Sequence, residues 1–270
     1  VHGNGNVGIG TTSPGEILEI CKEAKSNSDK CILILKNKGV VKINDLVKLT
    51  DTSESTIRRD LTYLESIHEL KRIHGGATLL KGRFNEPSYK EKQDQHICEK
   101  SKIAKYAVDL IEEGDCIYLD AGTTTFNMIQ YLDKKDIVVV TNGLKHIDAL
   151  VEKDIKAYIL GGRVKARTKA VVGIDALKNL EKFRFDKCFL GTNAIHLEYG
   201  FTTPDSEEAI LKEKAIQLSK EAFVLADESK FGEITFVKIA DLDAATIITD
   251  SEVEDYERYA EKTRVEVVME

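Results

Sequence analysis

Small polar residues follow several short apolar segments in the second half of the chain, and their types favour binding of an anion. They are Asp120-Ala-Gly-Thr-Thr-Thr125, Thr141-Asn-Gly143, Gly161-Gly-Arg163, Gly191-Thr-Asn193 and Asp227-Glu-Ser-Lys230. Backbone N–H groups and Thr hydroxyls between a strand and a helix can surround a phosphate at the positive helix end. One such loop is ordinarily a capped turn, but five at the carboxyl ends of strands favour a phosphate site.

A basic and hydroxyl-rich stretch nearer the N-terminus could contact DNA. The stretch Ser53–Leu61 begins with a good N-cap residue, and its apolar stripe leaves hydroxyl and basic side chains on the outer face. Arg can form hydrogen bonds to guanine in the major groove, and Ser or Thr can contact bases or phosphates. The alternative is a solvated helix face, which composition by itself favours. The outer face carries Ser55, Arg58, Arg59 and Thr62.

The elements around this stretch predict a small DNA-binding module of three short helices and a hairpin. Cys31, Ile32 and Leu35 mark the first helix, which Gly39 ends. Residues 70–80 read as strand, Gly75-Gly76 turn and strand, which is typical of a wing. The wing carries Lys71, Arg72 and His74, which we expect to contact phosphates or the minor groove without specifying sequence.

From residue 101 onward, short apolar strands alternate with helical patterns, so we expect a largely parallel sheet covered on both faces. The predicted strands are 116–120, 137–141, 157–160, 187–190, 223–226, 245–248 and 265–268. The predicted helices are 125–132, 144–153, 175–183, 206–220 and 251–262.

Composition and charge divide the chain further. Residues 28–90 hold 12 Lys plus Arg against 8 Asp plus Glu, a net of +4; because the whole chain carries -7, the rest carries -11. This asymmetry indicates one module that binds a polyanion and one that does not. We predict an atypical N-terminal segment, flexible or artificial in origin (1–27), a DNA-binding domain (28–82), a linker (83–100) and an effector domain (101–270).

Several classes of function are excluded or disfavoured. Gly3, Gly5 and Gly8 match G-x-G-x-x-G but follow no strand, so a dinucleotide site is improbable, and the P-loop string is absent. The histidines show no zinc-like spacing to cysteines, so no metal or cofactor is expected. No membrane span or secretory signal is predicted, and five widely spaced cysteines indicate reduced thiols and a cytoplasmic protein.

Specific strings carry a family resemblance. Thr56-Ile-Arg-Arg-Asp-Leu61, Leu64-Glu65 and Leu70-Lys-Arg-Ile-His-Gly-Gly-Ala77 resemble the N-terminal signature of the DeoR family of bacterial transcription regulators. The resemblance implies that Ser55, Thr56, Arg58 and Arg59 face DNA, whereas Asp60 buttresses the helix. The family's usual Gly after the recognition helix is missing, with Ile67-His68-Glu69 in its place. The full set of DNA-binding candidates is Ser53, Ser55, Thr56, Arg58, Arg59, Lys71, Arg72 and His74.

The second module resembles the DeoR effector domain, which is similar to the sugar-phosphate isomerase and deaminase fold. The resemblance rests on the loops named above, with Gly173 and Ala226-Asp-Glu-Ser-Lys-Phe231. It implies a phosphate at Gly122, Thr123 and Thr124, with Asp227 and Lys230 on the phosphate or sugar hydroxyls. The ligand-binding candidates are Asp120, Gly122, Thr123, Thr124, Thr125, Asn142, Gly143, Gly162, Asn193, Lys212, Asp227 and Lys230.

The predicted function is a DNA-binding regulator, a repressor of a sugar-utilisation operon, that binds operator DNA as a homo-oligomer. Residues 184–191 and 198–205 are similar to fructose operon repressors, which suggests fructose 1-phosphate as effector. The alternative is a sugar-phosphate isomerase-like enzyme. Isomerases of this fold carry an acidic Gly-Ala-Asp-Glu stretch where this chain has Gly191-Thr-Asn-Ala194. Asn193 binds a hydroxyl but accepts no proton at neutral pH, so we expect binding without turnover.

Overall fold

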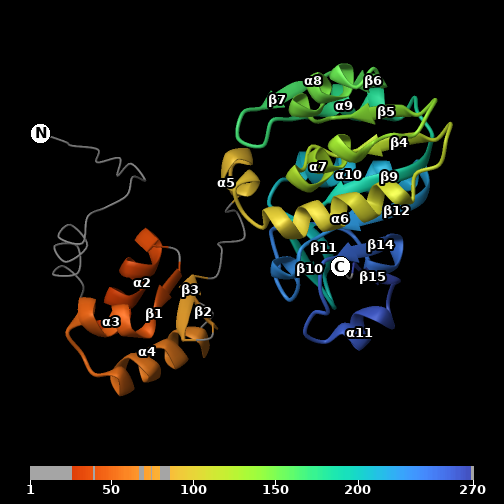
Figure 1. Ribbon diagram of the computed structural model, residues 1–270. Coiled ribbons are helices and arrows are strands. Elements are labelled where there is room, and N and C mark those ends of the chain that lie inside the picture. The colour runs from red at the N-terminus through yellow and green to blue at the C-terminus, as the bar shows by residue number, and fades with distance from the viewer. Residues whose placement is uncertain (1–25, 39, 67–69, 74, 80–85, 269–270) are drawn as a thin grey trace, which may run out of the picture. The chain divides into compact units, whose positions relative to one another are not determined.

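The structure is a computed structural model that describes residues 26–38, 40–66, 70–73, 75–79 and 86–268. The chain divides into two compact units, Val1–Gly82 and Arg83–Glu270, which Figure 1 shows in red to orange and in yellow to blue. Residues 1–25, which include Gly3, Gly5 and Gly8, lie outside the described residues.

The first unit is a winged helix-turn-helix, as the sequence predicts. Its helices are α2 (Asn27–Lys38), α3 (Ile43–Thr50) and α4 (Glu54–Ser66). Its antiparallel sheet has the order β1-β3-β2, with β1 at Val40–Lys42, β2 at Leu70–Ile73 and β3 at Gly76–Leu79. The strand β1, which the sequence analysis does not predict, joins the wing hairpin to the helices through pairing with β3.

A small apolar core holds this unit together. Ile57, Leu61 and Leu64 recur at helical spacing, and all three are buried against α2, α3 and the wing. Leu46 of α3 and Leu70 of β2 are equally buried. This packing leaves the opposite face of α4 exposed to solvent.

The second unit contains a seven-stranded parallel sheet with the order β15-β14-β12-β9-β4-β5-β6. All seven strands expected from the sequence are in it. Their bounds are β4 Cys116–Leu119, β5 Val138–Thr141, β6 Lys156–Ile159, β9 Phe185–Gly191, β12 Ser219–Leu225, β14 Thr246–Thr249 and β15 Val265–Val267.

Helices cover both faces of this sheet (Figure 1). One apolar cluster packs a sheet face under α6, α7 and α8, and a second packs the other face under α9, α10 and α11. The helix bounds are α6 Ile97–Asp109, α7 Thr123–Tyr131, α8 Leu144–Glu152, α9 Ile174–Leu180, α10 Ser206–Gln217 and α11 Tyr256–Ala260. The fold class predicted from the alternating pattern is therefore confirmed.

Several elements of the second unit differ from the sequence prediction. The stretch 83–100, expected as a linker, contains α5 (Tyr89–Gln93) and the start of α6. The polar residues of this stretch show no helical pattern, because the buried face of α5 is only one turn long. Short β pieces were also unforeseen: a β7 (Arg163–Lys165) and β8 (Ala170–Val172) hairpin, and a small sheet of β10 (Ala194–His196), β11 (Gly200–Thr203) and β13 (Val237–Ala240).

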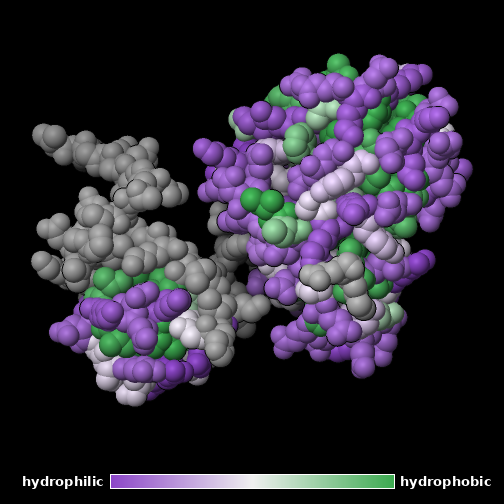
Figure 2. Space-filling model, viewed as in Figure 1, coloured by the Kyte–Doolittle hydropathy of each residue, from purple (hydrophilic) through white to green (hydrophobic). Residues whose placement is uncertain are grey.

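Hydrophilic side chains cover most of the face of the second unit that Figure 2 shows, with hydrophobic residues visible in the gaps. In the described part of the chain, no helix is long and apolar enough to cross a membrane. The four described cysteines, Cys31, Cys98, Cys116 and Cys188, are free thiols.

Candidate functional site

The order of the strands places a topological switch point between β4 and β9, and we call the space beyond the carboxyl ends of these two strands the crevice. From β4 the chain adds β5 and then β6 on one side, whereas β9, β12, β14 and β15 extend the sheet on the other side. The connections that leave β4 and β9 therefore run in opposite directions, and ligands of open α/β sheets bind at such a switch point. A Cβ built on Gly122 would lie 3.8 Å from the Cα of Gly191, so the loops after β4 and β9 meet there.

The N-terminus of α7 lies at this switch point, and Thr123 and Thr124 are buried there. Gly122 is the N-cap residue, and the N–H groups of the first helical turn have no partner within the helix. Among the described residues, the hydroxyls of Thr123 and Thr124 also have no hydrogen-bond partner. The helix end thus presents amides and hydroxyls that match the oxygens of an anion.

The N–H group of Gly122 is not free to bind an anion, which differs from the sequence prediction. This N–H donates to the Asp120 carbonyl oxygen at 2.8 Å and to the Thr125 hydroxyl at 3.0 Å. The Thr125 hydroxyl in turn donates to the Asp120 carbonyl oxygen at 2.5 Å. Gly122 and Thr125 therefore hold the loop closed, and the anion-binding groups are those of Thr123 and Thr124.

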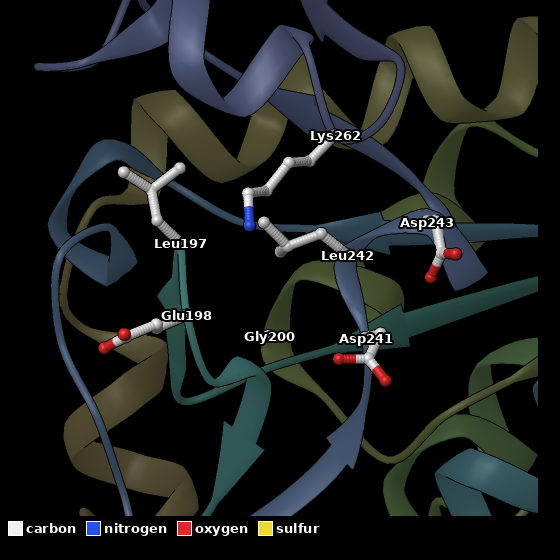
Figure 3. A pocket seen from close by; sticks show the side chains of 7 residues that line it. All are labelled: Leu197, Glu198, Gly200, Asp241, Leu242, Asp243 and Lys262. Atoms are coloured by element: carbon white, nitrogen blue, oxygen red, sulfur yellow. The ribbon is translucent and has the colours of Figure 1, made fainter.

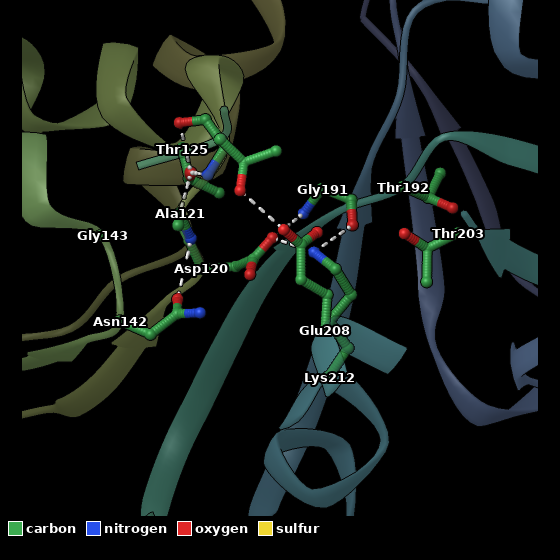
Figure 4. Close-up of polar contacts among 12 residues, drawn as sticks. Asp120, Ala121, Thr125, Asn142, Gly143, Gly191, Thr192, Thr203, Glu208 and Lys212 are labelled. Atoms are coloured by element: carbon green, nitrogen blue, oxygen red, sulfur yellow. Dashed lines mark hydrogen bonds and ion pairs between the residues drawn. The ribbon is translucent and has the colours of Figure 1, made fainter. Parts of the chain in front are cut away.

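Asp120 and Lys212 form a buried ion pair at the floor of the crevice (Figure 4). Each is 4% exposed. The Lys212 ammonium also donates to the Gly191 carbonyl oxygen at 2.9 Å, and the Gly191 N–H donates to the Asp120 carboxylate at 3.1 Å. Asp120 and Lys212, both predicted to contact the ligand, thus pair with each other. Their contacts join β4, β9 and α10.

Residues after β5 support the loop from behind. The Asn142 side-chain oxygen accepts from the Ala121 N–H at 2.9 Å (Figure 4). The Asn142 side-chain amide donates to the Val171 carbonyl at 3.3 Å. The His146 ring lies beside Gly143, where a Cβ would come within 2.2 Å of Nδ1. Asn142 and Gly143 therefore position the loop after β4.

The fully buried His146 was not predicted as part of the site. Its Nε2 lies 3.3 Å from the Thr125 hydroxyl, and its ring packs edge-on against Phe126. Burial lowers the pKa of His146 to about 3, although a hydrogen bond to the Asp120 backbone opposes this shift. A neutral imidazole therefore lies under the anion-binding loop at physiological pH.

The loop after β12 brings a further carboxylate and cation. Asp227 is 2% exposed, and its carboxylate lies 3.7 Å from the Lys230 ammonium. Burial raises the pKa of Asp227, but the charge of Lys230 and the hydrogen bond from Ser229 outweigh burial and lower it. Asn193, after β9, accepts from the Thr203 hydroxyl at 3.1 Å.

Gly162 does not join this group. It follows β6, the edge strand, which lies two strands from β4. Its φ is 153°, and a Cβ there would come within 2.7 Å of the Val172 carbonyl oxygen. The glycine is therefore needed for close packing of the backbone against β8.

Ion pairs that the sequence did not predict surround the crevice. Lys165, on the β7–β8 hairpin, contacts the carboxylates of Glu86, Asp205 and Glu208 at 2.6, 2.8 and 3.1 Å. Glu208 lies one helical turn before Lys212 on the same helix. This spacing is the only local signal in the sequence that could have placed Glu208 near the site.

The candidate DNA-binding surface lies on α4. Ser53 caps this helix: its hydroxyl accepts from the Thr56 N–H at 3.3 Å and lies 2.9 Å from the hydroxyls of both Ser55 and Thr56. Ser53 is therefore tied to the helix, with Ser55 exposed beside it.

Arg58 and Arg59 extend from the outer face of α4, where they line a shallow hollow with Thr62, Tyr63 and Ser66. Arg58 pairs with Glu54 at 2.7 Å, and both side chains are about half exposed. Such an exposed pair is worth about 0.5 kcal/mol, so it yields readily to a phosphate or a base. Arg59 is exposed and has no partner among the described residues.

The wing is fixed to the same helix. Arg72 of β2 donates through its guanidinium to the Thr62 hydroxyl at 2.9 Å, and its N–H donates to the Glu65 carboxylate at 2.8 Å. Arg72 thus positions the wing in addition to offering charge. The side chain of Lys71 and the whole of His74 lie outside the described residues.

A separate cavity lies in the second unit between the small sheet and the segment after β13 (Figure 3). It is lined by Leu197, Glu198, Gly200, Asp241, Leu242, Asp243 and Lys262. None of the predicted ligand-binding residues lines it. In the part of the chain that the structure describes, no group of three or more His, Cys, Asp or Glu side chains is placed to hold a metal ion.

A winged helix-turn-helix joined to an α/β unit with a polar crevice at its switch point defines a transcription regulator with a sensor domain. Comparison with known families agrees: residues 29–83 match the DeoR-like helix-turn-helix domain, and residues 95–251 match the DeoR C-terminal sensor domain. The chain belongs to the DeoR family of transcriptional regulators.

Two curated relatives illustrate this membership. The chain is 58% identical to the uncharacterized HTH-type transcriptional regulator FruR of Bacillus subtilis, over 85% of this chain and 92% of the relative. It is 34% identical to the lactose phosphotransferase system repressor of Staphylococcus aureus, over 89% of this chain and 97% of the relative.

Solved structures are more distant. Ribose 5-phosphate isomerase A of Neisseria gonorrhoeae matches with 17% identity and a TM-score of 0.37, over 50% of this chain and 53% of that chain. The chain thus spans about half the length of that isomerase. The eIF2B delta structure of Chaetomium thermophilum matches with 14% identity and a TM-score of 0.43, over 95% of both chains.

Proposed function

We propose that this protein is a repressor of a sugar-utilisation operon whose DNA binding is controlled by a phosphorylated sugar. The observation that carries the proposal is the N-terminus of α7, where unpartnered amides and hydroxyls of Thr123 and Thr124 lie at the switch point of the sheet. A phosphate monoester matches these donors in charge and geometry. The name of the lactose phosphotransferase system repressor supports sugar-linked regulation.

Fructose 1-phosphate is the effector we favour. The segments 184–191 and 198–205, which resemble fructose operon repressors, include β9 and the turn between β10 and β11. Both segments border the crevice through Gly191 and Thr203. The 58% identity to a regulator named FruR is consistent with the same sugar.

In the proposed mechanism, α4 enters the major groove of an operator and the wing contacts the backbone. One recognition helix covers one half-site, so a dimer or higher oligomer is required. Effector binding then lowers operator affinity by a coupling free energy of about 1 to 3 kcal/mol.

The alternative of a sugar-phosphate isomerase is disfavoured by the carboxylates of the site. A general base needs a pKa near the working pH, whereas the pKa of Asp227 is lowered below its usual value. Asp120 and Glu208 are in ion pairs with Lys212 and Lys165. We therefore propose a site that binds a sugar phosphate without turning it over.

Calorimetric titration tests the proposal. The panel is fructose 1-phosphate, fructose 6-phosphate, glucose 6-phosphate and unphosphorylated fructose, and the same samples are assayed for isomerised product. We expect fructose 1-phosphate to bind, fructose not to bind, and no product to form. Thr124→Val keeps the shape of the side chain but removes its hydroxyl, and should weaken binding about tenfold. Turnover of any sugar phosphate would contradict the sensor assignment.

A further inference from the structure

The large sheet has one edge that exposes apolar side chains. The strand β6 ends the strand order and pairs with β5 on one side only, and α8 packs against it. Ten large hydrophobic side chains in the described part of the second unit are exposed, and six of them lie between residues 144 and 174, in and around β6. Figure 1 shows α8 and β6 together at this end of the sheet, and Figure 2 shows hydrophobic atoms at its surface. The exposed apolar residues are therefore gathered at one edge.

Helix α8 carries apolar residues on two faces. His146 and Leu150 are fully buried toward the interior of the unit. Leu144 and Val151, on the other face, are 44% and 65% exposed, and Ile147 lies between them at helical spacing. A helix that is apolar on all sides is normally covered on all sides. In the part of the chain that the structure describes, nothing covers this outer stripe.

The strand β6 extends the same apolar surface. Tyr158 and Ile159 are 43% and 40% exposed, and neighbouring side chains of a strand point to opposite faces, so both faces of this edge are apolar. The opposite edge of the sheet differs, because β15 carries the ion pair of Arg264 and Glu266 and exposes neither of its valines. An uncharged edge strand is a template for pairing with another chain. We call this surface the edge patch, which consists of Leu144, Val151, Tyr158 and Ile159.

The charges of α8 oppose its own helix dipole. Lys145 lies in the first turn, at the positive end, and Glu152 lies in the last turn, at the negative end. Both are exposed, and neither has an ion pair among the described residues. A second α8 in antiparallel orientation would bring Lys145 of one copy beside Glu152 of the other and would align the two dipoles favourably. Asp148 lies between the two charges, one turn from Lys145 of its own copy.

We propose that the edge patch binds the edge patch of a second copy of this chain, with the two α8 helices antiparallel about a twofold axis. A twofold interface uses the same surface on both copies, so the surface must be complementary to itself. Apolar residues flanked by Lys145 and Glu152 meet this requirement. The inference rests on the proposed function for the choice of partner, since operator binding requires a dimer. The switch point between β4 and β9 lies two strands from β6, so the interface and the effector site are separate surfaces.

Sedimentation equilibrium of the full chain, without DNA or sugar phosphate, tests this interface. We expect the wild type to form a dimer, or an even multiple of one, at micromolar concentration. Val151→Arg places a charge in the edge patch at a side chain that is 65% exposed in the single chain, and should raise the dissociation constant of the dimer at least about tenfold. Ile210→Arg, at an exposed position of α10 on the other side of the sheet, is the matched control and should stay within threefold of the wild type.

A charge exchange on α8 tests the antiparallel arrangement. Lys145→Glu and Glu152→Lys each create like-charge contacts across the twofold axis, and each should weaken the dimer about tenfold at low ionic strength. The double variant restores opposite charges and should return to within threefold of the wild type. A misfolded protein would not be rescued in this way, and urea unfolding of each variant followed by circular dichroism checks the fold independently.

The outcomes separate the inference from the proposed function. A wild type that remains monomeric, or a dimer that Val151→Arg leaves unchanged within twofold, would overturn the inference. Dissociation by Ile210→Arg alone would place the interface on α10 and would also overturn it. A double variant no tighter than the weaker single variant would overturn the antiparallel arrangement. None of these results alters the titration with fructose 1-phosphate, which tests the proposed function at a different surface.

Discussion

At the scale of single residues, the buried pair of Asp120 and Lys212 should contribute to stability. Both side chains are buried, so each needs the other to offset the cost of desolvation. The pair joins residues 92 positions apart in the sequence, and it connects the loop after β4 to α10.

Replacing one partner should therefore be costly. We expect Lys212→Met to lower the free energy of unfolding of the second unit by about 3 to 5 kcal/mol, because Asp120 is left buried and unpaired. Urea denaturation followed by circular dichroism measures this loss. The double variant Asp120→Asn with Lys212→Met should recover part of it. A Lys212→Met protein within 1 kcal/mol of the wild type would show that the pair is not buried in solution.

His146 should make the second unit sensitive to acid. Its pKa is about 3 when folded and about 6.5 when unfolded. Above pH 6.5 the imidazole is neutral in both states and has no effect. As the pH falls below 6.5 the unfolded state alone takes up the proton, so stability is lost by about 1.4 kcal/mol per pH unit until the folded pKa is reached.

The comparison of wild type with His146→Gln isolates this effect. Between pH 7 and pH 5 the wild type should lose about 2 kcal/mol more than the variant, because all other titrating groups are shared. Urea unfolding at the two pH values gives both numbers. Parallel pH dependence of the two proteins would mean that His146 is protonated or solvated in the native state. Phe126, Thr125 and Gly143, which surround the ring, supply no charge that could cause the shift.

At the scale of elements, α4 and α7 each bury one face in an apolar core. The functional groups of α4 lie on its opposite face, and those of α7 lie at its N-terminus. For α4 the apolar residues Ile57, Leu61 and Leu64 anchor the helix, so Arg58 and Arg59 must face outward. For α7 the turn at Gly122 and Thr125 fixes the direction of the first amides.

Substitutions on the outer face of α4 should weaken DNA binding without unfolding the unit. We expect Arg59→Ala and Arg58→Ala each to cost about 1 to 3 kcal/mol in operator affinity. A duplex selected from a random-sequence library serves as operator, and fluorescence anisotropy measures binding. Lys105→Ala, which removes an exposed charge from α6 in the other unit, is the matched control. Equal, small losses in all three variants would indicate that α4 does not contact DNA.

At the scale of the whole molecule, effector binding to one unit and DNA binding to the other must be energetically coupled if the proposed regulation is correct. Linkage requires that the coupling be reciprocal: if the effector weakens operator binding by a given factor, the operator weakens effector binding by the same factor. For a coupling of about 1 to 3 kcal/mol this factor is about 5 to 150.

Two titrations check this reciprocity. Operator binding is measured with and without saturating fructose 1-phosphate, and fructose 1-phosphate binding is measured with and without saturating operator. The two ratios should agree within twofold. Effector binding that left operator affinity unchanged would rule out control of DNA binding by this ligand.

Local patterns in the sequence determined the elements and the nature of the two units. The spacing of Ile57, Leu61 and Leu64 predicts α4, and short apolar runs predict all seven strands of the large sheet, because periods of 3.6 and 2 depend only on neighbouring residues. The loop 120–125 was predicted to bind an anion from a local signal as well, because its Gly and Thr residues directly follow a predicted strand. The helix α5 escaped prediction because its one-turn buried face leaves too few residues to form a period.

Tertiary structure alone decided which of the candidate residues are available to a ligand. Asp120 and Lys212 are both polar and both near the crevice, yet they bind each other, and the amide of Gly122 is consumed by Thr125. The strand order placed Gly162, which follows β6, two strands away from β4. These outcomes depend on contacts between residues far apart in the chain, and the distance between such residues is set by the order of the strands, which no local period encodes.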